Sequence, residues 1–112
     1  MKSIKMLLVA VCAILTVSLF AQEIKTVVIK VNGECGMCKK KIETAAKQPG
    51  VTKADWNKDT KQLTLSYNPA KVNTDSVQKK IAAVGYDTEK YKADDKAYGE
   101  LDECCQYERK KQ

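Results

Sequence analysis

Two cysteines separated by two residues, Cys35 and Cys38, are the residues of this sequence best suited to chemistry. They stand where a turn-rich loop joins a predicted helix, and Lys39, Lys40 and Lys41 follow directly. The amides of a helix N-terminus and nearby lysines favour the thiolate form of cysteine. Two thiolates on a loop suit a soft ion of low coordination number, Cu(I) or Hg(II), whereas Zn(II) normally takes four ligands. A thiolate of a second protein could then add to the ion and carry it away.

The C-x-x-C spacing alone leaves other chemistries open. It also occurs in structural disulfides and in thiol–disulfide oxidoreductases, in which Cys35 would be the nucleophile and Cys38 the resolving thiol. The 112 residues include no histidine, which excludes histidine-based acid–base catalysis and histidine metal ligands. This length accommodates one small domain. Any chemistry therefore depends on cysteine, lysine, carboxylates or tyrosine.

The elements that must position the two cysteines follow one another closely. Apolar residues alternate in 24–31, 51–57 and 63–67, which predicts strands, and recur at helical spacing in 38–48 and around 74–84. A short polar segment, 86–92, is predicted to be a last strand at the sheet edge. The order is βαββαβ, which predicts an α+β, ferredoxin-like fold with a four-stranded antiparallel sheet and two helices on one face.

The run from Gly33 to Val51, GECGMCKKKIETAAKQPGV, resembles the heavy-metal-associated domain of copper chaperones, of metal-transporting ATPase modules and of periplasmic mercury-binding proteins. The similarity covers 24–92 and continues through Ala54, Trp56, Leu63, Leu65, Tyr67, Pro69, Val77, Ile81 and Gly85-Tyr86. It implies that Cys35 and Cys38 are the metal ligands. It also implies that Tyr86 packs near the metal loop.

One position departs from the family pattern. Where the family usually has a methionine two residues before the first cysteine, which anchors the loop in the core, this chain has Gly33. We expect a more mobile loop, in which Met37 supplies part of the lost packing. Gly33, Met37, Lys39 and Tyr86 are therefore predicted to surround the two ligands.

Residues 1–21 are predicted to be a signal peptide. They combine a basic start, an apolar run over 6–20 and the small residue Ala21 before Gln22. The run is shorter than the roughly 20 residues of a membrane span. We therefore expect export to the periplasm, with the domain formed by 22–92, or a membrane anchor if the segment is not cleaved. Cys12 lies within the apolar run and would leave with it.

The C-terminal segment 93–112 carries a second thiol pair, Cys104 and Cys105, and is predicted to be helical from Asp94. A helix folded back along the sheet would bring both thiols towards Cys35 and Cys38. They would then add ligands and give tighter Cu(I) binding, a small copper cluster, or a site for Zn(II) or Cd(II). A disulfide within or between the two pairs, and a disordered tail, are the alternatives.

The sequence thus predicts an exported soft-metal-binding protein that is not an enzyme. Its partners would be a metal-transporting ATPase, a membrane transporter or a cuproprotein with a thiol site. A periplasmic thiol–disulfide oxidoreductase is the alternative. Nucleic-acid binding is not expected, despite the net charge of +6, because the first strand lacks stacking aromatics. We expect a monomer, although two dithiol loops could share one ion in a metal-bridged dimer.

Overall fold

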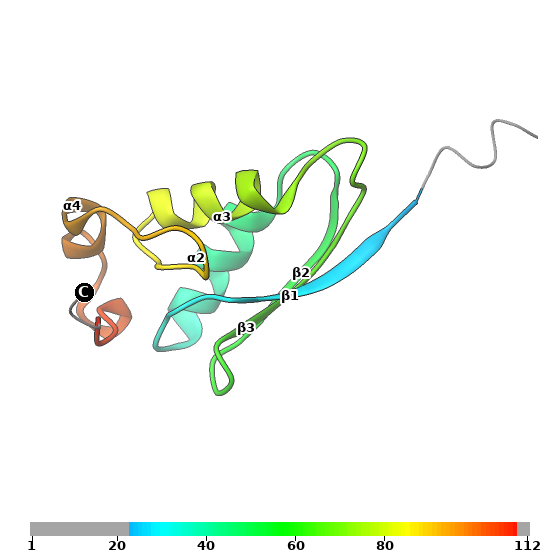
Figure 1. The fold of residues 1–112 in the computed structure, drawn as a ribbon. Helices are drawn as coiled ribbons and strands as arrows, with labels where there is room; N and C mark the ends of the chain where they lie inside the picture. Colours follow the sequence, from blue (N-terminus) through cyan, green and yellow to red (C-terminus); the bar gives the residue numbers. More distant parts are fainter. Residues whose placement is uncertain (1–22, 110–112) are drawn as a thin grey trace, which may run out of the picture.

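The computed structural model describes residues 23–109, so the predicted signal peptide and residues 110–112 lie outside the described part. A three-stranded antiparallel sheet is covered on one face by two helices (Figure 1). The elements in chain order are β1 (Lys25–Lys30), α2 (Gly36–Ala46), β2 (Val51–Asn57), β3 (Gln62–Tyr67), α3 (Thr74–Ala83), α4 (Asp95–Gly99) and the 3₁₀ helix η2 (Glu103–Cys105). Within 23–109, no helix has the length and apolarity needed to cross a membrane.

The core lies between the sheet and helices α2 and α3. Strand β3 is central, in the order β1-β3-β2, and its Leu65 stands opposite Val27 of β1 and Ala54 of β2. Alternate residues of β3 are buried, and α2 buries Cys38, Ile42 and Ala46 on one face. The predicted α+β class is therefore confirmed. The burial of Cys38 also fixes the start of α2 against the core.

The prediction of a fourth strand over 86–92 is wrong. Only an isolated bridge joins Val31 to Thr88, because the chain turns back after it. The Thr88 amide donates to the Tyr91 carbonyl at 2.8 Å, and the buried Gln78 side chain accepts from the Thr88 hydroxyl and the Lys90 amide. Residues 88–91 therefore form a turn, held by Gln78 of α3, in place of the predicted strand.

The C-terminal segment does not form the single helix from Asp94 to Cys104 that the sequence predicted. Helix α4 ends at Gly99, and η2 forms only after Leu101 and Asp102. The Leu101 side chain packs on Gly85, where an added Cβ would lie 3.0 Å from Leu101 Cγ. Gly85 also has a φ of +109°, a conformation that glycine adopts most readily. Residues 93–109, which we call the tail, can therefore pack directly against the backbone at Gly85.

Tyr107 anchors the tail beyond the thiol pair. Its ring stacks on Tyr86 with centroids 6.2 Å apart and meets Tyr98 edge-on at 5.0 Å. Its hydroxyl donates to the Gly85 carbonyl at 3.0 Å and accepts from the Asp87 amide at 2.8 Å. Burial raises the pKa of Tyr107 to about 12. The Tyr107 hydroxyl thus binds backbone groups of Gly85 and Asp87 that a neighbouring strand would otherwise bind.

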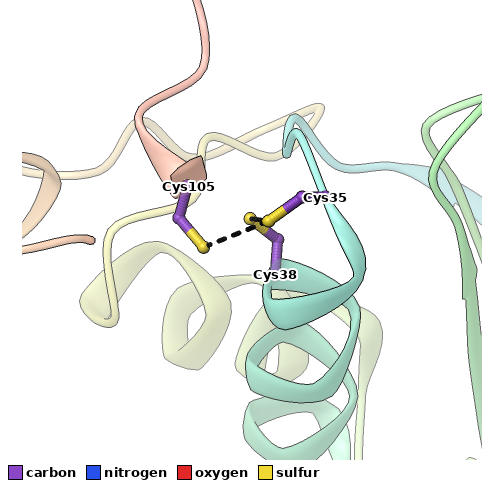
Figure 2. Close-up of side chains that lie close together, drawn as sticks. All are labelled: Cys35, Cys38 and Cys105. Carbon is purple, nitrogen blue, oxygen red and sulfur yellow. Dashed lines mark hydrogen bonds between the residues drawn. The ribbon is translucent and has the colours of Figure 1, made fainter. Parts of the chain in front are cut away.

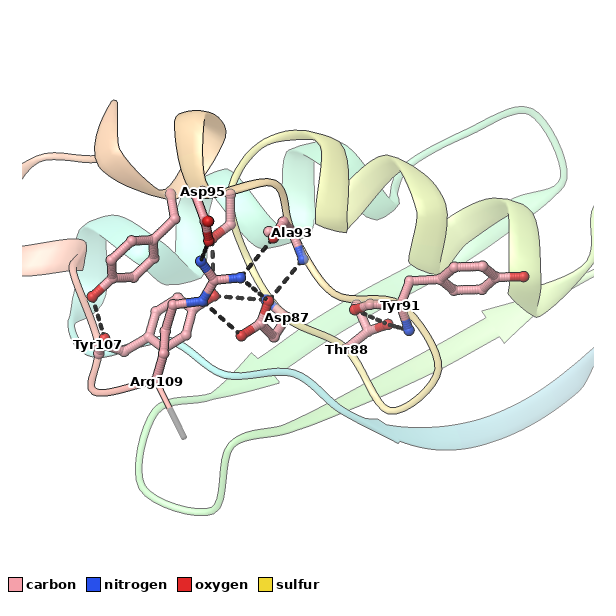
Figure 3. A network of polar contacts seen from close by, with 9 residues as sticks. Asp87, Thr88, Tyr91, Ala93, Asp95, Tyr107 and Arg109 are labelled. Carbon is pink, nitrogen blue, oxygen red and sulfur yellow. Dashed lines mark hydrogen bonds and ion pairs between the residues drawn. The ribbon is translucent and has the colours of Figure 1, made fainter. Parts of the chain in front are cut away.

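Arg109 completes the attachment of the tail (Figure 3). Its guanidinium donates to both carboxylate oxygens of Asp87, at 3.1 and 3.0 Å, to Asp95 at 2.9 Å and to the Ala93 carbonyl at 2.6 Å. It also lies over the Tyr98 ring. Burial alone would raise the pKa of Asp87, but Arg109 and the Ala93 amide hold that pKa below its ordinary value.

We predict that Asp87→Asn lowers the free energy of unfolding by about 2 kcal/mol at neutral pH, because it removes charged hydrogen bonds. The pKa of Asp87 is lower in the folded protein than in the unfolded chain, so its carboxylate stabilises the fold above about pH 4. This stabilisation is lost as the pH falls through the pKa of the folded state. Urea unfolding at several pH values should therefore show the difference from wild type shrinking in acid. Asp59→Asn, in the exposed turn after β2, is the control. A pH-independent difference would contradict this role of Asp87.

Candidate metal site

Four sulfur atoms from two segments far apart in the sequence gather at the N-terminus of α2. The sulfur of Cys35 lies 3.7 Å from that of Cys38, 3.9 Å from Cys105 and 3.3 Å from Cys104. The sulfurs of Cys35, Cys38 and Cys105 lie within 4.8 Å of one another and point towards a common centre (Figure 2). These four cysteines, which are those of residues 23–109, form no disulfide with one another. The structure thus brings both predicted thiol pairs together.

The neighbours of Cys35 lower the pKa of its thiol. Cys35 is the N-cap residue of α2, with extended backbone angles. The Cys38 amide, the Cys104 thiol and the Met37 amide favour its thiolate and hold the pKa of Cys35 at about 7. Burial instead raises the pKa of Cys105 to about 12. Near neutral pH the partly exposed thiol of Cys35 is therefore readily ionised, whereas the buried thiol of Cys105 is protonated.

The structure places Lys39 away from the sulfurs. Its ammonium donates to the Asp55 carboxylate at 2.7 Å and to the Trp56 carbonyl at 3.0 Å, and pairs with Glu43 at 3.2 Å. These carboxylates raise the pKa of Lys39. Lys39 thus ties α2 to β2, and the thiolate of Cys35 is favoured by helix amides instead of by this lysine.

Trp56 occupies the space beside Gly33. A Cβ added to Gly33 would lie 2.8 Å from two atoms of the indole ring and 3.1 Å from Ile42. The indole N–H donates to the Val31 carbonyl at 3.0 Å, and the Lys61 ammonium donates to the Gly33 carbonyl. The expectation that Met37 supplies the lost packing is wrong, because Met37 is 52% exposed. Its sulfur instead lies 3.7 Å from that of Cys104, at the site's outer side.

Tyr86 forms the inner wall of the site. Its side chain is fully buried, and its hydroxyl has no hydrogen-bond partner among residues 23–109. Burial and then the thiols of Cys105 and Cys38 raise the pKa of Tyr86 well above its ordinary value. An O–H group therefore remains available beside these two sulfurs.

Sequence reasoning missed the residues that hold the site together from a distance. In the sequence, Trp56 stands out only as a residue shared with the family pattern, although a large indole together with an unexpected glycine indicates that the two positions exchange volume. Tyr107 and Arg109 carried no local pattern, because their partners at Gly85 and Asp87 lie about twenty residues away. The tyrosine and the arginine that follow Cys105 were the available signal.

The fold and the site together define a small α+β domain with a dithiol loop at a helix N-terminus, the class of domain that binds metal through sulfur. Residues 27–87 match the family model of the heavy-metal-associated domain. This match covers more than half of the chain, and the chain belongs to that family. The matched region ends at residue 87, so the tail with Cys104 and Cys105 lies beyond it.

The relatives include chaperones and transporters. The copper chaperone CopZ of Staphylococcus epidermidis is 37% identical over 62 residues, which cover 54% of this chain and 91% of the chaperone. A copper-exporting P-type ATPase of Bacillus subtilis is 38% identical over 66 residues, 57% of this chain and 8% of the ATPase. The chain thus spans less than a tenth of that transporter's length.

Two solved structures are similar in fold. A CopZ metallochaperone has a TM-score of 0.55 and 33% identity, and the alignment covers 57% of this chain and 98% of that one. Oxidised MerP from Ralstonia metallidurans CH34 has a TM-score of 0.56 and 29% identity, over 60% and 96% of the two chains. Both alignments cover about three fifths of the present chain and nearly all of the other.

We predict that Gly33→Met destabilises the protein by about 1–3 kcal/mol, because the new side chain overlaps the Trp56 ring. The double variant Gly33→Met/Trp56→Leu should be more stable than the sum of the two single changes predicts, since the methionine then occupies the vacated volume. Chemical unfolding of the four proteins gives the coupling free energy. Additive effects would show that Gly33 and Trp56 do not compete for one space.

Proposed function

We propose that this protein binds Cu(I) through Cys35 and Cys38 and passes it to a second protein by exchange of thiolate ligands. The observation that carries the proposal is the 3.7 Å separation of the two sulfurs at the N-terminus of α2. Sulfur ligands select soft ions, and the acidic Cys35 supplies a thiolate near neutral pH. Hg(II) could use the same two ligands, whereas Zn(II) and Cd(II) would need additional sulfurs.

Transfer requires that a partner's sulfur can reach the bound ion. Cys35 is partly exposed, and Met37 and Cys104 beside it are exposed, so the site is open on this side. Cys38 lies fully buried behind it. A metal-transporting ATPase, a membrane transporter or a cuproprotein with a thiol site would approach here. The similarity to CopZ and to copper-exporting ATPases supports this choice of partner.

We predict that Cys35→Ser/Cys38→Ser lowers Cu(I) affinity at least about 100-fold, because both thiolates of the loop are lost. The measurement is a titration of anaerobically reduced protein against a chromophoric Cu(I) chelator, with the metal count from native mass spectrometry. Cys35→Ser alone serves as the control for folding, since Cys38 is buried and Cys35 is not. Equal competition by the wild type and the double variant would refute the proposal. Insulin reduction by the wild type, without Cu(I) binding, would favour the oxidoreductase alternative.

We propose further that the protein acts after export, in the periplasm, where its metal partners would expose their thiols. The basic and apolar segment 1–21 supports this, and its removal would leave Gln22 as the first residue. We expect the intact mass of protein recovered from the periplasmic fraction to correspond to residues 22–112. Recovery with membranes at full mass would indicate an anchor, and recovery of the full-length chain from the cytoplasm would contradict export.

A further inference from the structure

We propose that the docked tail supplies Cys105 as a third ligand to the ion held by Cys35 and Cys38, and Cys104 as a fourth for ions that require one. The tail sulfurs would then fill the coordination shell, and they would have to leave the ion before a partner's thiolate, arriving at the exposed side, can take it. This inference rests on the proposed function, because it concerns the same ion. It assigns the segment beyond residue 87 a role that the family match does not cover.

The separations of the sulfurs suit a shared ion. Around an ion with metal–sulfur bonds of about 2.3 Å, three sulfurs in a plane lie about 4.0 Å apart and four in a tetrahedron about 3.8 Å apart. The sulfur of Cys35 lies 3.7 Å from Cys38 and 3.9 Å from Cys105. Cys104 lies 3.3 Å from Cys35 and 4.0 Å from Cys105, on the exposed side. Small side-chain rotations would centre Cys35, Cys38 and Cys105 on one ion, whereas Cys104, which lies outside the group within 4.8 Å, would have to move further to join them.

The tail is held in this place by contacts that do not involve sulfur. Leu101, before the thiol pair, packs on Gly85, and Tyr107, after it, bonds the Gly85 carbonyl. The Asp102 carboxylate pairs with Lys41 of α2 at 3.4 Å. Cys104 and Cys105 are thus fixed from both sides, and their approach to Cys35 is built into the packing of the domain.

The environment of Cys105 suits a bound thiolate. Cys105 and Cys38 are fully buried, and the unpartnered hydroxyl of Tyr86 lies beside them. A buried O–H group without an acceptor is unfavourable, and a metal-bound thiolate would accept its hydrogen bond. On binding, the Cys105 thiol would release its proton to solvent and its sulfur would donate an electron pair to the ion. No oxidant or reductant takes part.

The consequence is a site that retains its ion while the tail is docked. Cu(I) would bind Cys35, Cys38 and Cys105, and Cd(II) or Zn(II) would add Cys104 to complete a tetrahedron. A partner's thiolate would meet a filled shell in place of an open one. Undocking of the tail would remove Cys105 and Cys104 together and restore the two-coordinate loop.

The matched variants Cys105→Ser and Cys104→Ser test the ligand assignment in the reduced protein. For Cu(I), we expect Cys105→Ser to lower the affinity by about ten-fold or more, because even the loss of a residue that only supports a metal ligand costs about that much. Cys104→Ser should leave the Cu(I) affinity unchanged. For Cd(II), the ultraviolet absorption of the cadmium–thiolate bonds should fall in both variants. Circular dichroism checks that each variant is folded.

A third variant, Arg109→Gln, tests the docking while all four thiols remain. It removes the ion pair with Asp87 outside the sulfur site, so the tail should undock more often. We expect faster loss of Cu(I) to a chelator, measured by stopped flow at fixed chelator concentration. Lys90→Gln is the control, because its ion pair with Asp75 of α3 is exposed and does not involve the tail.

The possible failures can be told apart. If Cys35→Ser/Cys38→Ser abolishes Cu(I) binding but Cys105→Ser and Arg109→Gln behave as wild type, the tail is not a ligand and the proposed function stands. If the wild type does not compete for Cu(I), the proposed function fails and the inference fails with it. If Cys105→Ser unfolds, an unchanged rate of Cu(I) loss in Arg109→Gln is enough to overturn the inference.

Discussion

Asp87 binds both segments that carry the sulfurs, and the arrangement of the site depends on it. Its carbonyl accepts from the Asn32 amide at 2.9 Å, at the start of the metal loop. Its amide and its carboxylate bind Tyr107 and Arg109 of the tail. A residue predicted to pair along a sheet edge therefore joins the loop to the tail. Because every polar group of this residue is used, its position leaves little freedom to either segment.

Two glycines allow the close approaches on which this arrangement is built. At Gly33 the backbone lies against Trp56, so the loop rests on a rigid ring where the family usually has a flexible methionine. At Gly85 the backbone lies against Leu101, and the tail can enter beside Tyr86. A side chain at either position would separate surfaces that now touch. The loop and the tail are therefore positioned by backbone shape as much as by polar contacts.

The sequence was sufficient for the parts of the fold that are determined locally. Alternation in 63–67 and helical spacing from Cys38 to Ala46 predicted β3 and α2, and the C-x-x-C loop at that helix was found from its residues. The prediction of the last strand was wrong because the conformation of this segment depends on Gln78 of α3, which binds Thr88 and Lys90. The approach of Cys105 to Cys35 was raised as a hypothesis. Its cause, packing at Gly85 and Asp87, has no local signature.

If Cys105 binds the ion as proposed, the same contacts set the balance between holding the ion and releasing it. The tail is attached by side chains, chiefly Leu101, Tyr107 and Arg109, and by no strand pairing within the described residues, so it can open while the sheet stays intact. The rate at which a partner meets a two-coordinate ion would then be proportional to the fraction of time that the tail is undocked. Stronger docking would favour storage, and weaker docking would favour transfer. On this proposal, a partly buried ion pair and one tyrosine, about twenty residues from their partners in sequence, would tune metal exchange without altering the thiol loop itself.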